Sequence, residues 1–126
     1  MRKLNQKEEQ IMQILWRLGR AFTKEIRAEM EDPKPPITTI SSTVRKLEQE
    51  GWLGYEAFGK TYRYYPIIAQ EDYLKSSFKR MVNSYFDGSP SRLLSFFAKE
   101  EQVNADELNQ ILKEIEDQED SKRKKK

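Results

Sequence analysis

The sequence predicts a mainly α-helical protein with one small β-hairpin. Apolar residues recur at helical spacing in several stretches of the 126-residue chain. Two short segments rich in aromatic residues, 52–58 and 61–66, are separated by a Gly-Lys pair, which is the length of a tight hairpin turn. Glycine and proline divide these stretches from one another and so predict where each element ends.

The first helix is expected over about residues 6–18, with Gly19 as its stop. Trp16 in this helix and Trp52 later in the chain are expected in the core. The broad apolar side of the helix comprises Ile11, Met12, Ile14, Leu15 and Trp16.

Residues 21–22 are too few to predict a strand alone, although they can pair beside the later hairpin. Thr23 is a favourable N-cap for a second helix, in which Ile26 and Met30 share a face. Three prolines within residues 32–36 cannot lie inside a helix, so this run predicts a stiff turn.

A third helix is expected to begin at Ile37, after that turn. Ile40, Val44 and Leu47 recur at i, i+4 and i+7, an apolar stripe that seats a helix on a core. Gly51 suits the left-handed conformation that commonly ends a helix.

The outer face of the third helix carries short hydroxyls and cations, with no carboxylate before Glu48. Its residues are Thr38, Thr39, Ser41, Ser42, Arg45, Lys46 and Gln49. One explanation of the hydroxyls is structural, since hydroxyl side chains near a helix N-terminus are also favoured as caps without any binding role. Beside two cations and a hairpin with a basic tip, they indicate a helix that enters a nucleic-acid groove, because short side chains permit close approach and cations neutralise phosphate.

Helix, helix, proline turn, helix, strand, strand is the order of a winged helix-turn-helix, so residues 1–68 are predicted to form a DNA-binding domain. The hairpin cations are expected to touch phosphate. The hairpin tyrosines are expected to pack the wing onto the core; they are Tyr62, Tyr64 and Tyr65. The predicted DNA-binding residues are Thr38, Thr39, Ser41, Ser42, Arg45, Lys46, Lys60 and Arg63.

Residues 69–119 predict three more amphipathic helices, over about 70–85, 91–99 and from Asn104 onward, with Ser89 as a further N-cap. So much apolar surface cannot be buried within roughly fifty residues, which predicts a homodimer. Two copies on a two-fold axis suit a palindrome with half-sites about 34–36 Å apart. The expected interface residues are Phe78, Met81, Leu93, Phe97, Leu108, Ile111 and Ile115.

The net charge of +2 hides a polarity along the chain. Residues 1–68 hold 12 Lys and Arg against 9 Asp and Glu, whereas residues 69–121 hold 6 against 12. The last five residues are all basic, and residues 120–126 are expected to form a solvated, disordered tail. Acidic residues of the last helix lack the spacing of a calcium loop, so no metal site is expected there.

The composition argues against an enzyme. No cysteine is present, so disulfides, thiolate nucleophiles and cysteine metal sites are excluded. The absence of histidine removes the commonest general base and metal ligand. We expect no catalytic residues and no cofactor. No apolar run approaches the roughly 20 residues of a membrane span, and the N-terminus lacks a signal-peptide core, so a cytoplasmic protein is expected.

Several short motifs resemble the penicillinase and methicillin-resistance repressor family, which also includes copper-responsive repressors. The resemblance covers roughly residues 4–118. The motifs are Leu4…Ile11-Met12…Leu15-Trp16, Lys24-Glu25-Ile26, Thr39-Ile40…Ser42, Lys46-Leu47…Gly51-Trp52-Leu53 and Tyr62…Tyr64-Tyr65-Pro66.

This resemblance implies a homodimeric winged-helix repressor that binds dyad operators of β-lactamase or related genes. It also implies inactivation by proteolysis, induced through a membrane-bound sensor metalloprotease. The copper-responsive branch, which carries a C-terminal cysteine cluster, is excluded because this chain has no cysteine.

Two departures from the family pattern bear on function. Ser41 stands where the family often has Lys and Arg45 where Asn is common, so a different operator sequence is expected. The family's scissile Asn-Phe bond corresponds here to Ser95-Phe96, which keeps only the Phe. Ser95 and Phe96 are therefore the cleavage candidates.

Two alternatives remain open. A winged-helix module that binds a protein instead of DNA would carry exposed apolar or acidic side chains on the outer face of the third helix, and this face carries neither before Glu48. A regulator that senses a small ligand at an apolar dimer interface, without a proteolytic switch, is the other alternative.

Overall fold

In the computed structural model, residues 1–100, 104, 106, 107, 109–111, 113, 114 and 117 are described. The chain divides into two compact units, Met1–Ser77 and Phe78–Lys126. The division falls inside one helix, α4 (Gln70–Tyr85), so that helix contributes residues to both units.

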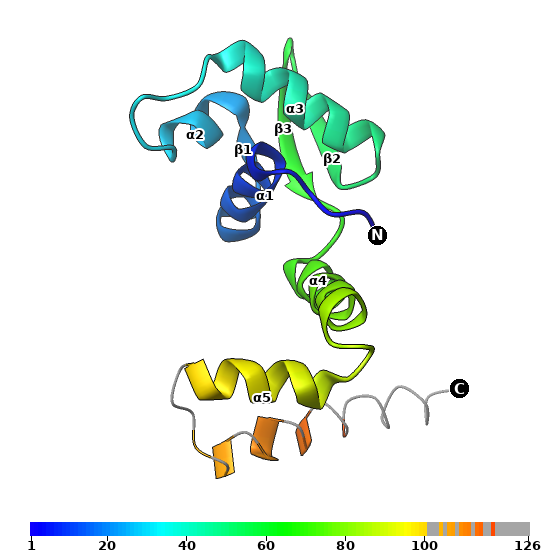
Figure 1. Cartoon of the computed structure of the whole chain (residues 1–126). Helices are drawn as coiled ribbons and strands as arrows, with labels where there is room; N and C mark the ends of the chain where they lie inside the picture. Colours follow the sequence, from blue (N-terminus) through cyan, green and yellow to red (C-terminus); the bar gives the residue numbers. More distant parts are fainter. Residues whose placement is uncertain (101–103, 105, 108, 112, 115–116, 118–126) are drawn as a thin grey trace, which may run out of the picture. The chain divides into compact units, whose positions relative to one another are not determined.

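The first unit is a winged helix, as the order of predicted elements indicated. Its elements are α1 (Gln6–Leu18), β1 (Ala21–Phe22), α2 (Thr23–Ala28), α3 (Ile37–Gln49), β2 (Leu53–Phe58) and β3 (Thr61–Pro66) (Figure 1). The antiparallel sheet of this unit has the order β1-β3-β2. Phe58 pairs with Thr61 across the predicted turn, and Ala21 pairs with Tyr64.

Local signals set most of the helix ends. Gly19 and Gly51 adopt φ values of 83° and 87°, the left-handed region where glycine is favoured. The predicted N-cap of α2 is wrong: Phe22 holds that position and Thr23 is the first helical residue. The Glu25 carboxylate accepts a hydrogen bond from the Phe22 backbone N–H at 2.9 Å, which supplies the capping contact that we had assigned to the Thr23 hydroxyl.

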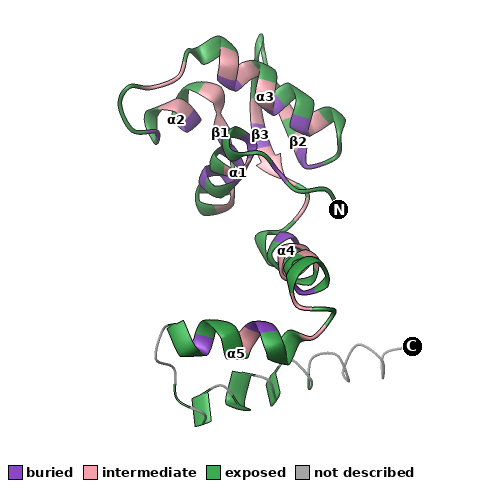
Figure 2. Ribbon diagram, viewed as in Figure 1, coloured by how far each residue is buried: buried purple, intermediate pink, exposed green. Residues whose placement is uncertain are grey.

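The core of the first unit lies between α1, α2, α3 and the sheet, where the buried positions concentrate (Figure 2). The predicted stripe of α3 is completely buried, with Ile40, Val44 and Leu47 at most 1% exposed. Both tryptophans take part as predicted. Trp52 is buried, and half-buried Trp16 packs against the core while its indole N–H donates to the Ile68 carbonyl at 2.9 Å.

The start of α4 also belongs to this core. The ring of buried Tyr73 lies between Trp16 and Trp52, with centroid separations of 5.8 and 5.6 Å, and its hydroxyl accepts from the Leu4 N–H. The next residue, Leu74, is 58% exposed. The domain boundary after residue 68 stays a prediction, but the contacts of the first unit extend beyond it.

The second unit contains the later part of α4 and α5 (Pro90–Glu100). As predicted, Ser89 caps α5, because its hydroxyl oxygen accepts from the Arg92 N–H at 3.3 Å. Val82, Leu93 and Ala98 are buried within the unit. Asn104 caps the following segment by accepting from the Glu107 N–H at 2.8 Å, as its spacing predicted.

Candidate nucleic-acid interface

The exposed face of α3 lies opposite its buried stripe. Thr38, Ser42, Arg45 and Gln49 are spaced at i, i+4, i+7 and i+11, and all four are exposed. Thr39 and Ser41 flank this line and are half-buried. The Ser42 hydroxyl donates to the Thr39 carbonyl at 3.0 Å, which leaves its oxygen lone pairs available as acceptors.

The two cations of α3 are differently placed. Arg45 forms no salt bridge or hydrogen bond with the part of the chain that the structure describes, so its guanidinium is available to a partner. The Lys46 ammonium instead lies 3.4 Å from a carboxylate oxygen of Glu8 in α1. Lys46 therefore joins two helices as well as facing solvent.

Glu8 is the centre of a charged cluster that our sequence analysis missed. Its carboxylate is 1% exposed and accepts two hydrogen bonds from Arg2, at 2.6 and 2.9 Å, and one from the Asn5 backbone N–H at 2.9 Å. These contacts, with the Arg2 hydrogen bonds the largest cause, lower the pKa of Glu8 to about 2. Arg2 also contacts Glu50 at 2.7 Å, so the cluster ties the start of α1 to the end of α3.

A sequence signal for this cluster was present. The side chain of Asn5 accepts from the Glu8 N–H at 2.8 Å, which completes a capping box of N-cap and N3 residues. The Asn-x-x-Glu spacing before an apolar run predicts such a capping box. It does not predict that Arg2 and Lys46 both contact the carboxylate of Glu8.

The two hairpin residues that we predicted to contact phosphate, Lys60 and Arg63, lie in different environments. Lys60 is exposed at the turn and forms no ion pair within the fully described first unit. Arg63 is half-buried, lies 3.5 Å from Glu56 and stacks over the Phe58 ring with 4.8 Å from its Cζ to the ring centroid. Arg20 also pairs with Glu56, at 2.6 Å. Arg63 thus already has partners on the wing.

The three hairpin tyrosines do not share one role. Tyr64 is buried, and Tyr65 lies across Gly54 so closely that an added Cβ there would meet its ring at 2.5 Å. Tyr62 is 45% exposed, so the prediction that it packs the wing onto the core is wrong. Strand alternation does not explain the difference, because Tyr62 and Tyr64 face the same side of the sheet. Tyr62 lies nearer the turn of the hairpin, beside the exposed residues Ala57 and Phe58.

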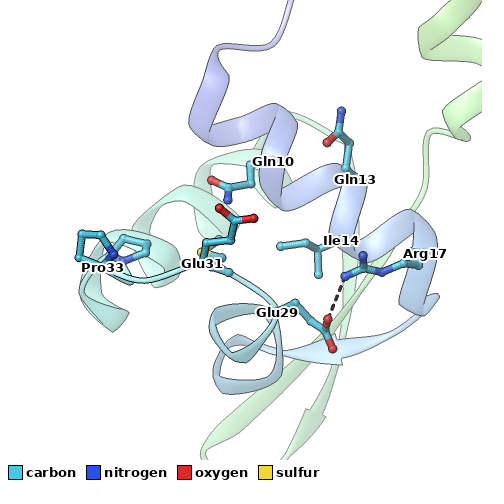
Figure 3. A pocket seen from close by; sticks show the side chains of 9 residues that line it. Gln10, Gln13, Ile14, Arg17, Glu29, Glu31 and Pro33 are labelled. Atoms are coloured by element: carbon cyan, nitrogen blue, oxygen red, sulfur yellow. Dashed lines mark hydrogen bonds and ion pairs between the residues drawn. The ribbon is translucent and has the colours of Figure 1, made fainter.

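A hollow beside α1 lies on a different surface. It encloses about 430 Å³ between α1 and the proline-rich turn, and Ile14 and Met30 are its buried apolar residues. Gln10, Gln13 and Glu31 surround it, and the Arg17–Glu29 ion pair of 3.0 Å lies at one side (Figure 3). Its polar lining does not match the apolar interface pocket of our ligand-sensing alternative.

The predicted interface residues of the second unit fall into three groups. Met81, Phe97 and Ile111 are 42%, 43% and 40% exposed, whereas Phe78 is half-buried and Leu93 is buried. Leu108 and Ile115 lie outside the described residues, as does the basic tail of residues 120–126.

The cleavage candidates lie in the middle of α5. Phe96 is 51% exposed and contacts the rings of Phe86 and Phe97, with centroid separations of 5.7 and 5.2 Å. Ser95 is exposed on the same helix and lines a shallow hollow with Phe96.

Residues 4–117 match the penicillinase repressor family. The chain belongs to this family. The penicillinase repressor of Bacillus licheniformis is 21% identical over 126 residues, which cover 96% of this chain and 95% of that protein. The methicillin resistance regulatory protein MecI of Staphylococcus aureus strain N315 is 22% identical over 110 residues, covering 86% and 89%.

Two solved structures are similar to this penicillinase repressor family member. The DNA-binding domain of the repressor BlaI is 25% identical, with a TM-score of 0.49, over 58% of this chain and 94% of that domain. The CopR repressor structure is 24% identical, with a TM-score of 0.45, over 53% of this chain and 99% of that one.

Family membership assigns the chain to transcriptional repression, which is not an enzyme class. Within the described residues, no group of three or more His, Cys, Asp and Glu side chains is arranged to hold a metal ion. None of the helices in that same part of the chain is long and apolar enough to cross a membrane.

Proposed function

We propose that this protein is a dimeric, sequence-specific DNA-binding repressor of β-lactamase-type or related genes that acts in the cytoplasm. The observation that carries the proposal is the exposed line of hydroxyl, amide and guanidinium groups on α3, with Arg45 unpaired at its middle. Such groups are donors and acceptors for base edges in a major groove, and Arg is the commonest side chain to contact guanine. A protein-binding face would offer apolar or acidic groups instead.

The remaining predicted contacts extend this surface. Thr38, Thr39, Ser41 and Ser42 lie along the N-terminal half of α3, where a recognition helix meets base edges and nearby phosphates. Lys46 and Lys60 add positive charge at the margins. Arg63 can reach phosphate only in competition with Glu56, so we assign it the weaker part of this role.

Dimerisation through the second unit would allow the repressor to bind a palindromic operator. Exposed apolar side chains on α4 and α5 support this, because Met81, Phe96 and Phe97 would otherwise remain in water. Two recognition helices on one dimer bind two half-sites with a gain in effective concentration.

Proteolysis between Ser95 and Phe96 is the proposed off-switch, with a membrane-bound sensor metalloprotease as the source of the signal. The bond lies within helical α5, and a protease requires an extended substrate, so cleavage needs local unwinding. Exposure of both residues supports access once the helix opens.

Selection from a random duplex library tests the proposal. The full-length protein should enrich a palindrome whose half-sites lie about one helical turn, roughly 34–36 Å, apart. Arg45→Ala should lose that enrichment while it keeps the wild-type fold by circular dichroism. Recovery of no common sequence by a folded wild-type protein would refute sequence-specific repression and favour the protein-interaction alternative.

A further inference from the structure

Two tyrosines lie on the β2–β3 hairpin with hydroxyl groups that have no hydrogen-bond partner in the first unit. Tyr55 of β2 pairs directly with Tyr64 of β3, and Tyr62 is the next residue of β3 on the same face. The rings of Tyr55 and Tyr62 are therefore diagonal neighbours, with centroids 4.8 Å apart. They form a two-ring surface, which we call the tyrosine pair.

The tyrosine pair is exposed although Tyr64, on the same face of the sheet, is not. Tyr55 and Tyr62 are 47% and 45% exposed, whereas Tyr64 is 7% exposed. Neither phenol hydroxyl of the pair has a hydrogen-bond partner in the first unit, every residue of which is described. A phenol that only fills space would bury its ring, so the exposed pair is available to a partner.

The pair is continuous with the proposed recognition surface. The β2 strand packs on α3, and the Tyr55 ring also contacts Tyr64, at 6.3 Å between centroids. Exposed Arg45 and half-buried Glu48 of α3 both act electrostatically on that same Tyr64 phenol. Lys60 is exposed at the turn that follows β2, so a cation also lies at the tip of the hairpin.

We propose that Tyr55 and Tyr62 contact the DNA backbone, with their hydroxyls donating to phosphate oxygens and their rings against the sugars. This rests on the proposed DNA-binding function. A polyanion fits the surface because Arg45 and Lys60 are exposed cations that form no ion pair in the first unit, and no carboxylate of β2 or β3 lies on the face of the pair. Glu56 points to the opposite face and pairs with Arg20 and Arg63. The tyrosine pair thus makes the wing contact for which the sequence suggested Arg63.

The chemistry of a phenol gives this contact a distinct signature. A neutral hydroxyl donates a hydrogen bond to phosphate and positions the protein without reading sequence. It carries no charge and releases no counterion, so it contributes affinity but not salt dependence. Loss of a Lys or Arg contact to phosphate lowers both the affinity and its salt dependence.

The double variant Tyr55→Phe/Tyr62→Phe tests the proposal, since it removes only the two hydroxyls. We expect the double variant to bind both the selected palindrome and random duplex DNA at least about tenfold more weakly, because each hydrogen bond to a charged group contributes about tenfold or more. The slope of log K against log salt should match the wild type. Tyr65→Phe is the matched control on the opposite face of the sheet and should bind like the wild type.

Unchanged affinity of the double variant, or a loss confined to Tyr65→Phe, overturns the tyrosine contact. A reduced salt slope also overturns it, because the variant would then have displaced a cation. If the wild-type protein binds DNA and Arg45→Ala binds it more weakly, either of these results refutes only the tyrosine contact, and the proposed function stands. If the wild type binds no DNA, both this inference and the proposed function fail.

Nitration by tetranitromethane gives a readout that does not depend on variants. Bound palindromic DNA should protect Tyr55 and Tyr62 of the full-length protein, as mapped by peptide mass spectrometry. Tyr65 should react equally with and without DNA. Equal nitration of the tyrosine pair in the free and bound protein overturns the proposal.

Discussion

The buried carboxylate of Glu8 at the start of α1 accepts a pair of hydrogen bonds from the guanidinium of Arg2, whose side chain is 38% exposed, at 2.6 and 2.9 Å. Glu8 also lies 3.4 Å from Lys46 of α3. Stability of the fold and placement of α3 are therefore coupled through one buried charge.

Stability should fall as this carboxylate is protonated. The folded pKa of Glu8 is about 2 against an ordinary value of 4.5, so the stabilisation is complete above about pH 4.5 and is lost as the pH falls through about 2. The difference corresponds to about 3 kcal/mol. Glu8→Gln should lower the free energy of unfolding by about this amount at pH 7, measured by urea denaturation, and by much less at pH 2.

Glu9→Gln is the matched control for this measurement. Glu9 adjoins Glu8 on α1 but accepts only a long hydrogen bond of 3.4 Å from Gln13. Its replacement should change stability at pH 7 by less than about 0.5 kcal/mol. Equal losses for the two variants, or a loss for Glu8→Gln that does not diminish with acid, would contradict the assignment.

Arg45→Ala should weaken binding to the selected palindrome by about 1–3 kcal/mol if Arg45 contacts a base. Because Arg45 is exposed and unpaired within the described chain, the thermal midpoint should hardly change. Arg17→Ala removes the same charge from α1 and serves as the control in a fluorescence anisotropy titration. Similar losses in both variants would indicate a general charge effect instead of a base contact.

Lys60→Ala should weaken binding to specific and random DNA alike. Loss of one phosphate contact should make the slope of log K against log salt shallower by up to about 0.9. Adding Arg63→Ala should change the slope less than the first substitution, since Arg63 is engaged by Glu56 and Phe58. A defect restricted to the palindrome would mean that the wing reads sequence.

Truncation after Ser95 should prevent one dimer from binding both half-sites of the palindrome together. It removes Phe96, Phe97 and everything beyond, which strips much of the proposed interface without altering α3. The truncated protein should sediment as a monomer or loose dimer and bind the full palindrome far more weakly than the full-length protein does. A tight dimer with full affinity would refute both the interface and cleavage at Ser95-Phe96 as an off-switch.

Local signals in the sequence determined the elements. The limits of α1 and α4 and the turn at Gly59-Lys60 follow from apolar periodicity, glycine stops and turn length, all of which act over a few residues. The exposed side of α3 was equally predictable, because the buried stripe of Ile40, Val44 and Leu47 leaves one opposite face for solvent.

The tertiary structure alone decided which partners these side chains meet. Lys46 pairs with Glu8, and Tyr73 accepts from Leu4 at a separation of 69 residues. Tyr62 stays exposed while Tyr64, two residues on, is buried. Such outcomes depend on how helices and strands distant in sequence pack together, because burial and charge pairing are set by neighbours in space, whereas periodicity records only which face of each element is apolar.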